Sequence, residues 1–338
     1  MRVKRAMRLA GLGLVWLALI GTAVWGVLAL CYFDHAPGAW RTALASAFGL
    51  ASIATLGAFA WSRWRWPALA AYAALFTLLL WRWDAIEPSN DRDWQPESAV
   101  LAQASIDGDR VTVRNIRNFD YRSETDFTRS YYDKTFDLRQ LDAVDVVAVY
   151  WMGPAIAHVF LSFGFGNDHL AISIEARKER GEGYATLPGF FRQYELMYVV
   201  ADERDVIRLR TNYRHDPPEA VQVYRLVGTA ETRRRLFLDY VRQINALAQN
   251  AEFYNSLTTN CTSNIWLHAR VNPGHVPYSW KILASGYVPE YLYEAGRLDT
   301  RVPFEELQKR SLVNARAQAA DHAPDFSRRI RLPDQARP

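Results

Sequence analysis

The sequence has few residues of the kinds that form metal sites, nucleotide sites or disulfide frameworks. Only two cysteines, Cys31 and Cys261, and seven histidines occur among its 338 residues. It contains no Walker loop, no dinucleotide glycine fingerprint, no paired-cysteine zinc pattern and no His-Glu-x-x-His. We therefore expect neither a nucleotide cofactor nor a bound metal.

The soluble part of the chain also lacks an excess of positive charge. Residues 1–83 carry a net charge of +7, whereas the remaining 255 residues carry −3. The basic pI of about 9.0 thus belongs to the N-terminal segment. Because nucleic-acid binding requires a basic patch on the folded domain, we expect no nucleic-acid partner.

Long apolar runs fill the N-terminal segment. Leu9–Cys31, Thr42–Trp61 and Trp66–Trp81 contain 23, 20 and 16 residues without a charge, and a spanning helix needs about 20. The third run is short, but arginines on both sides of it can extend to the membrane interface. Eight of the twelve tryptophans lie in residues 1–83, which is typical of membrane-interface belts. We predict a three-helix transmembrane anchor over this segment.

Basic residues predict how this anchor is oriented. Lysine and arginine cluster before the first run and again between the second and third, and such clusters favour the cytoplasmic side. The start also resembles a signal peptide, but two further apolar runs follow, so we expect an uncleaved anchor. The pattern predicts a multi-pass protein of the bacterial inner membrane with its soluble domain in the periplasm.

The rest of the chain predicts one α+β domain, with an antiparallel sheet followed by packed helices. We expect a linker over 84–110, the domain over 111–318 and a flexible tail over 319–338. Strands are expected at 111–117, 142–151, 158–165, 168–175, 195–201, 206–210 and 221–226. Helices are expected at 231–250, 261–271, 279–285 and 289–297.

Cys261 is the only cysteine of this soluble domain, and it stands where a loop turns into a helix. Asn260 or Thr259 can cap that helix. In an oxidising compartment an unpaired thiol is either buried and inert or kept free for chemistry. Backbone N–H groups at a helix start favour a thiolate and can also hold an oxyanion. Cys261 is therefore a candidate nucleophile, with an inert core cysteine as the alternative.

The predicted hairpin places a base and a carboxylate together. If Gly166 and Asn167 form a two-residue turn, His158 faces Glu175 on one side of the sheet. A carboxylate beside an imidazole fixes its tautomer and stabilises its charged form. The pairing depends on register, because a slip of one residue would turn Glu175 to the other face.

Structural roles remain open for each of these residues. His158 can be an ordinary structural histidine, and Glu175 can simply pair with Arg177 or Lys178. His169 and His268 compete as bases, although His268 lies two turns beyond Cys261, too far for direct contact within one helix.

Four blocks of the sequence resemble the Lnb N-terminal periplasmic domain family. They occur in order over 158–165, 172–182, 190–205 and 254–265. The family is bacterial and membrane-anchored, and its type member is a lipoprotein intramolecular transacylase. The order of His158, Glu175 and Asn260-Cys261 is also similar to permuted papain-like enzymes, including the lecithin:retinol acyltransferase group. The resemblance implies that Cys261 is the nucleophile, His158 the base and Glu175 the orienting residue.

From these features we expect a membrane-anchored thiol acyltransferase of the cell envelope. It would move an acyl chain from a membrane lipid or lipoprotein ester to an amine through a Cys261 thioester. A thiol peptidase or amidase acting on cell-wall peptide is one alternative. A non-catalytic envelope binding or assembly module is the other.

Overall fold

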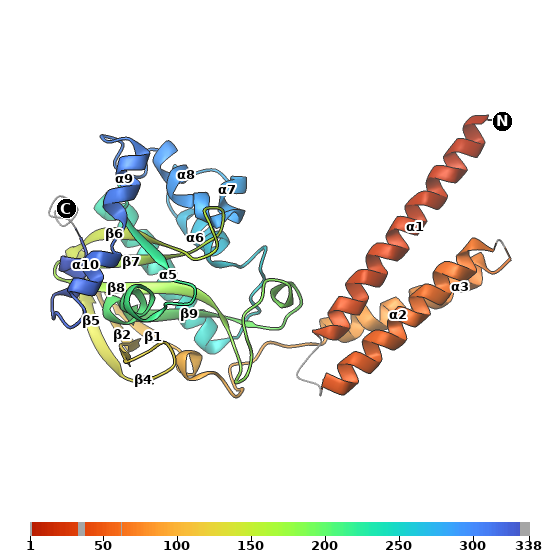
Figure 1. Cartoon of the computed structure of the whole chain (residues 1–338), viewed down its shortest axis with the longest axis horizontal. Coiled ribbons are helices and arrows are strands. Elements are labelled where there is room, and N and C mark those ends of the chain that lie inside the picture. Colours follow the sequence, from red (N-terminus) through yellow and green to blue (C-terminus); the bar gives the residue numbers. More distant parts are fainter. Residues whose placement is uncertain (1, 33–37, 62, 332–338) are drawn as a thin grey trace. The chain divides into compact units, whose positions relative to one another are not determined.

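The chain folds into two compact units. The computed structural model describes residues 2–32, 38–61 and 63–331. One unit, the helical unit, comprises Met1–Pro88 together with Ala185–Tyr194. The other, the sheet unit, comprises Ser89–Tyr184 and Glu195–Pro338 (Figure 1).

Three helices make up most of the helical unit: α1 (Arg2–Cys31), α2 (Gly38–Ala60) and α3 (Arg65–Asp84). Two segments are long and apolar enough to cross a membrane, Leu9–Cys31 with a mean hydropathy of 2.3 and Gly38–Ala60 with 1.7. The expectation of a third spanning helix is not supported. α3 forms, but its apolar run is shorter than a bilayer requires and is flanked by Arg65 and Arg82.

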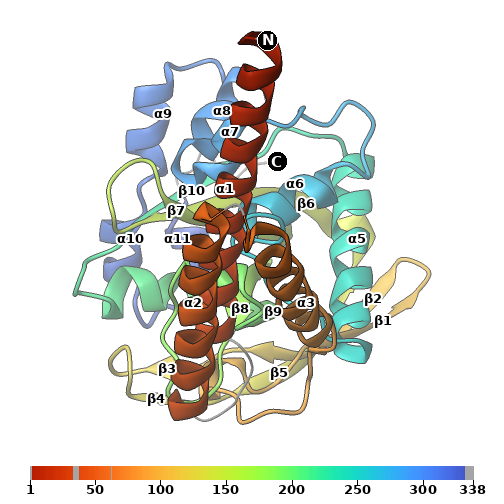
Figure 2. The same ribbon diagram turned by 90° about the vertical axis from the view of Figure 1, so that its right-hand side faces the viewer.

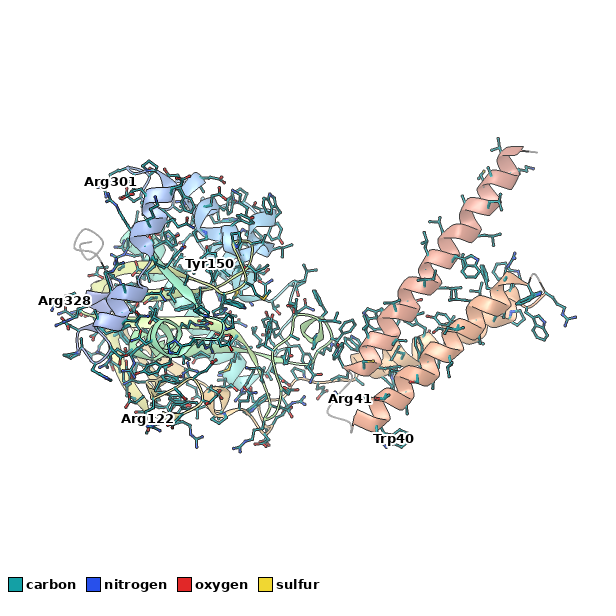
Figure 3. The ribbon with its side chains drawn as sticks, viewed as in Figure 1. Trp40, Arg41, Arg122, Tyr150, Arg301 and Arg328 are labelled. Carbon is teal, nitrogen blue, oxygen red and sulfur yellow. The ribbon has the colours of Figure 1, made fainter. Side chains whose placement is uncertain are left out.

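The three helices pack through aromatic and small polar side chains. Tyr72 of α3 lies against Phe48 of α2, with ring centroids 6.0 Å apart, and its hydroxyl lies 3.0 Å from that of Thr22 in α1. Trp40 and Arg41 mark the start of α2 (Figure 3). An exposed tryptophan beside an arginine is the composition expected at a membrane interface.

A mixed sheet forms the centre of the sheet unit, with strand order β1-β2-β9-β8-β7-β6-β10 and β5 paired to β2. The pairs are antiparallel except β2 with β9, which run parallel at Arg117 and Ala201, so the expected antiparallel sheet is corrected to a mixed one. Its strands are β1 (Gln103–Asp107), β2 (Arg110–Arg117), β5 (Tyr131–Asp137), β6 (Leu141–Tyr150), β7 (Ala157–Phe165), β8 (Asp168–Arg177), β9 (Glu195–Asp202) and β10 (Ala220–Arg225). A separate ribbon pairs β3 (Asp120–Tyr121) with β4 (Phe127–Thr128).

Helices cover both faces of this sheet, which confirms the α+β class. Figure 2 shows α5 on one side and α10 and α11 on the other. The α-helices are α4 (Glu203–Arg208), α5 (Ala230–Gln249), α6 (Cys261–Ala269), α7 (Trp280–Leu283), α8 (Val288–Glu294), α9 (Phe304–Ser311), α10 (Asn314–Ala319) and α11 (Phe326–Arg329). Short turns of helix are η1 (Pro96–Ser98), η2 (Leu138–Gln140), η3 (Pro188–Phe190), η4 (Leu209–Tyr213) and η5 (Ser285–Tyr287).

The hairpin predicted from the sequence is confirmed in detail. β7 and β8 pair from Leu161 with Ile172 to Phe165 with Asp168, which is the predicted register. Gly166 adopts a φ of 64°, the left-handed conformation that the first position of such a turn requires. This register puts His158 and Glu175 on one face of the sheet.

A strand expected at 206–210 is wrong. That segment forms α4 and the π-helical turn η4 instead. Asp202 caps α4 by accepting a 2.9 Å hydrogen bond from the N–H of Arg204, and Val206 and Ile207 are buried against the sheet. The adjacent apolar residues Val206 and Ile207 suggested a strand, but the capping hydrogen bond of Asp202 stabilises a helix here.

Much of the expected linker and much of the expected tail belong to the sheet unit. Within 84–110, β1 joins the sheet, and the Arg177 guanidinium lies 4.1 Å from the ring centroid of the buried Trp94. Within 319–331, Phe326 and Ile330 are buried, and Arg331 bonds to acidic side chains of the core. These contacts join residues far apart in sequence, so local composition did not indicate them. The rest of the expected tail, 332–338, lies outside the described residues.

Candidate active site

Cys261 is the first residue of α6, as the sequence predicted. Asn260 caps this helix, since its Oδ1 accepts a 2.8 Å hydrogen bond from the N–H of Ser263. The Asn260 amide also donates to the carbonyl of Ser256 at 2.9 Å, which fixes the preceding loop. Thr262, next in the helix, donates to the carbonyl of Ile282 at 2.5 Å. The thiol is thus held rigidly, and it is half-buried.

Strand β7 brings two groups to this thiol. The His158 imidazole and the backbone N–H of Val159 both act on the thiol in the direction that favours the thiolate. The paired residues of β7 and β8 begin only at Leu161 and Ile172. Val159 therefore lies outside that ladder, where its N–H can point at the thiol.

The loop before His158 is fixed by η5. Tyr150 (Figure 3) donates to the carbonyl of Gly286 at 2.8 Å, and the N–H of Gly286 donates to Ala155 at 3.0 Å. A Cβ at Gly286 would lie 2.0 Å from the carbonyl oxygen of Pro154, so only glycine fits here. The N–H of Ala157 completes the attachment by donating to Ser285 at 3.0 Å.

Glu175 and Ser173 hold the other side of the imidazole. His158 Nε2 lies 3.0 Å from Glu175 Oε1 and 2.7 Å from Ser173 Oγ, and Ser173 donates to Glu175 at 2.7 Å. Because Nε2 is occupied in this way, Nδ1 is the ring nitrogen left for Cys261. The carboxylate therefore fixes the tautomer that presents Nδ1 to the thiol.

Arg210 completes the group from the π-helical turn η4. Its guanidinium lies 3.5 Å from Glu175 and 3.4 Å from Glu219, which Arg214 also contacts at 3.0 Å. π-helical turns often occur at functional sites, because they turn a side chain out of the regular helical register. Arg210 and His158 thus both contact Oε1 of Glu175 and offset its charge.

The electrostatics of the group favour a charge-separated pair. Burial lowers the pKa of His158, but the Glu175 charge and the hydrogen bonds to Cys261 and Glu175 outweigh it and raise the pKa to about 9. Burial raises the pKa of Cys261, but the hydrogen bond and charge of His158 and the Val159 N–H bring it below its ordinary value. The pKa of Glu175 is also lowered despite burial, chiefly by His158 and Arg210.

This arrangement is suited to nucleophilic chemistry. A thiolate beside an imidazolium attacks a carbonyl carbon, and the imidazolium is placed to protonate the leaving group. The positive end of α6 stabilises the thiolate and any oxyanion formed next to it. Among the described residues no group of three or more His, Cys, Asp or Glu side chains is arranged to hold a metal ion.

The competing histidines lie elsewhere. His169 pairs with Gly164, six residues along β7 from His158, which corresponds to roughly 20 Å. Burial lowers the pKa of His169, and its charged neighbours include Glu203 and Arg331. His268 bonds through both ring nitrogens, to Asp239 at 2.8 Å and to the Tyr198 hydroxyl at 2.7 Å, as a structural histidine does.

Two members of the group, Ser173 and Arg210, were missed by sequence reasoning. Ser173 precedes Glu175 by two residues, so strand alternation places both on the face of His158. That signal was present in the sequence. Arg210 gave none, because its segment had been expected to form a strand.

Residues 127–286 match the family model of the Lnb N-terminal periplasmic domain. This part of the chain is thus similar to the Lnb N-terminal periplasmic domain, the family that the sequence blocks indicated. The matched range includes Cys261, His158 and Glu175. No curated protein and no solved structure matches the chain. The likeness to permuted papain-like enzymes stays a prediction.

The family and the helices together fit an envelope protein anchored in the inner membrane. The Lnb domain is periplasmic, and two N-terminal helices are apolar enough to cross a bilayer. With two supported spans instead of three, basic residues no longer suffice to place the sheet unit outside the cytoplasm. Its periplasmic location rests on the family.

Proposed function

We propose that the protein is a membrane-anchored thiol acyltransferase of the cell envelope. It transfers an acyl chain from a membrane lipid or lipoprotein ester to an amine. The observation that carries this proposal is the Cys261 thiol at the start of α6, whose pKa His158 lowers, together with the His158 Nε2 that lies 3.0 Å from Glu175.

In the first half-reaction the Cys261 thiolate attacks the ester carbonyl carbon. A C–S bond forms, the C–O bond breaks, and the His158 imidazolium gives its proton to the departing alkoxide. The acyl chain is now a thioester on Cys261. Negative charge on the carbonyl oxygen during this step lies next to the start of α6.

In the second half-reaction an amine attacks the thioester. Neutral His158 takes a proton from the amine as the C–N bond forms and the C–S bond breaks. The products are an amide and the original thiolate–imidazolium pair. Glu175, Ser173 and Arg210 stabilise and orient His158 through both steps.

Membrane anchorage supports a lipid substrate over a soluble one. Two candidate spanning helices keep the enzyme in the bilayer, where a diacylglyceryl lipid or lipoprotein also stays. A soluble cell-wall peptide would not require this arrangement.

A direct test is to incubate the full-length protein in detergent with a synthetic diacylglyceryl lipopeptide and follow both products by mass spectrometry. We expect a hydroxylamine-sensitive acyl adduct on Cys261 and an N-acylated lysolipopeptide. Cys31→Ala should retain both, and Cys261→Ala should lose both. Release of free fatty acid or peptide fragments without N-acylation would favour the hydrolase alternative. An unreactive Cys261 would favour the binding module.

A further inference from the structure

One loop that lies far from the N-terminal helices in sequence packs with them. Ala185–Tyr194 is the second part of the connection from β8 to β9, yet it belongs to the helical unit with Met1–Pro88. Its centre is η3, a single turn over Pro188–Phe190. This turn has no assigned part in the thiol chemistry.

Phe191 packs the loop against an aromatic cluster at the C-terminal ends of α1 and α3. Its side chain is buried, 5% exposed. Its ring centroid lies 5.8 Å from Tyr32, 6.1 Å from Trp83 and 6.4 Å from Trp25. Tryptophan and tyrosine at the ends of apolar helices are the side chains that occupy the headgroup layer of a bilayer.

Arg192 adds polar contacts to the same place. It donates to the carbonyl of Trp83 at 2.7 Å and of Ile86 at 3.3 Å, and its guanidinium lies 5.2 Å from the Trp83 ring centroid. A cation is favoured at the C-terminal end of a helix such as α3. Arg192 also has a φ of 54°, which a side chain other than glycine adopts only where its surroundings hold it.

Next to this attachment the loop exposes two large apolar side chains. Leu187 is 43% exposed and Phe190 is 38% exposed. In a turn of 3₁₀ helix residues three apart project from the same side, and the N–H of Phe190 donates to the carbonyl of Leu187 at 3.1 Å. Leu187 and Phe190 thus form one apolar tip beside the Phe191 cluster.

We propose that this tip inserts into the interfacial layer of the lipid bilayer. The tip is continuous with the aromatic ends of apolar helices, so lipid is the occupant that the neighbouring surface favours. The proposal rests on membrane anchorage and not on acyl transfer by Cys261. Its test therefore measures contact between the tip and lipid. Lipid insertion of the tip and acyl transfer by Cys261 can thus be disproved separately.

The test uses full-length protein in nanodiscs of phosphatidylethanolamine and phosphatidylglycerol. Leu187 or Phe190 is replaced by the photoreactive p-benzoylphenylalanine, and adducts are identified by mass spectrometry after irradiation. The matched control is the same replacement at Leu312, which is also 43% exposed but lies in the sheet unit. Size-exclusion chromatography confirms that each variant is folded.

We expect lipid adducts at both loop positions at about fivefold the yield at Leu312, because the interfacial layer surrounds the tip. Equal yields at the loop and at Leu312 would overturn the proposal. So would adducts formed only with protein, because these would assign the tip to a protein partner.

Discussion

Two groups of polar residues lie on the same face of the sheet, one half-buried and the other largely buried. The thiol cluster (Cys261, His158, Ser173, Glu175 and Arg210) contacts one end of β7, and the arginine cluster (Asp145, Ser162, Glu203, Arg225 and Arg331) contacts the other. Ser162 follows His158 by four residues, so alternation turns both to one face. The two clusters share strand β7 and both contain charged residues, but they differ in burial and in chemistry.

The arginine cluster is closed and saturated. Arg331 bonds to Asp145 at 2.8 Å and to Glu203 at 2.6 Å, Arg225 bonds to Asp145 at 2.6 Å, and Ser162 donates to Glu203 at 2.6 Å. The Glu203 side chain has no exposed surface, whereas that of Glu175 is 32% exposed. Buried charge alone therefore does not mark a functional site. The thiol cluster differs in two ways: it contains a nucleophile, Cys261, and its side chains are partly exposed to solvent.

The largest expected effect is a loss of acyl transfer, which should follow substitutions in the thiol cluster. Cys261→Ala and His158→Ala should each lower acyl transfer by at least about 10³-fold while leaving the fold intact, because they remove the nucleophile or its base. The double variant should be no worse than either single one, since the two residues act as a unit. Single-turnover assays on lipopeptide measure this, with Cys31→Ala as control. Near-normal turnover by Cys261→Ala would remove the thiol from the mechanism.

The next largest expected effect is a loss of stability, which should follow a substitution in the arginine cluster. Glu203→Ala leaves Arg331 buried without one of its two carboxylate partners and should cost about 3–5 kcal/mol of unfolding free energy. Transfer activity per folded molecule should stay normal. Denaturant unfolding in detergent measures the loss. Glu306→Ala, which breaks an exposed 2.8 Å pair with Arg310, should leave the transition unmoved. An equal shift in both variants would contradict the structural role.

The thiol cluster was largely predictable because its geometry is local. A two-residue turn at Gly166 fixes the register that brings His158 to Glu175, and the Asn260 cap fixes where the helix of Cys261 begins. The contact between α6 and the β7–β8 hairpin could not be predicted from local sequence patterns. It came only from the likeness to a known family.

The arginine cluster could not be predicted in this way. Arg331 is 186 residues from Asp145 and 128 from Glu203, in a polar segment that resembles a flexible tail. The single parallel contact between β2 and β9 is likewise invisible to periodicity, because alternation indicates a strand and not its partner.

A smaller effect concerns the charge state of the thiol. Below its pKa of about 9, His158 is protonated and supports the Cys261 thiolate. Glu175→Gln removes the charge that stabilises this imidazolium, so alkylation of Cys261 by iodoacetamide at pH 7 should slow about tenfold, equivalent to one pKa unit. If neither Glu175→Gln nor His158→Ala alters alkylation, the thiol is not coupled to either residue.

The same shift predicts a pH dependence of stability. His158 has an ordinary pKa of 6.5 when unfolded and about 9 when folded, so its protonation stabilises the fold fully below pH 6.5. This contribution is lost as the pH rises through 9. Glu175→Gln should flatten the decline, which denaturant midpoints at pH 6 and pH 10 would measure. An unchanged decline would assign it to other groups.

The smallest expected effect compares two serines in equivalent places. Ser173 donates to Glu175 at 2.7 Å beside His158, and Ser162 donates to Glu203 at 2.6 Å beside Arg331. Each hydrogen bond contributes about 0.5–1.5 kcal/mol. Ser173→Ala removes a hydrogen bond that orients the imidazole, so acyl transfer should slow roughly 2–10-fold. Ser162→Ala removes a hydrogen bond of the arginine cluster, so it should lower the unfolding free energy by a similar amount and leave the transfer rate unchanged. Unfolding midpoints and single-turnover rates of both variants test this. Because the ion pair of His158 and Glu175 survives without Ser173, a loss as large as that of His158→Ala would show that the hydroxyl itself takes part in the proton transfer.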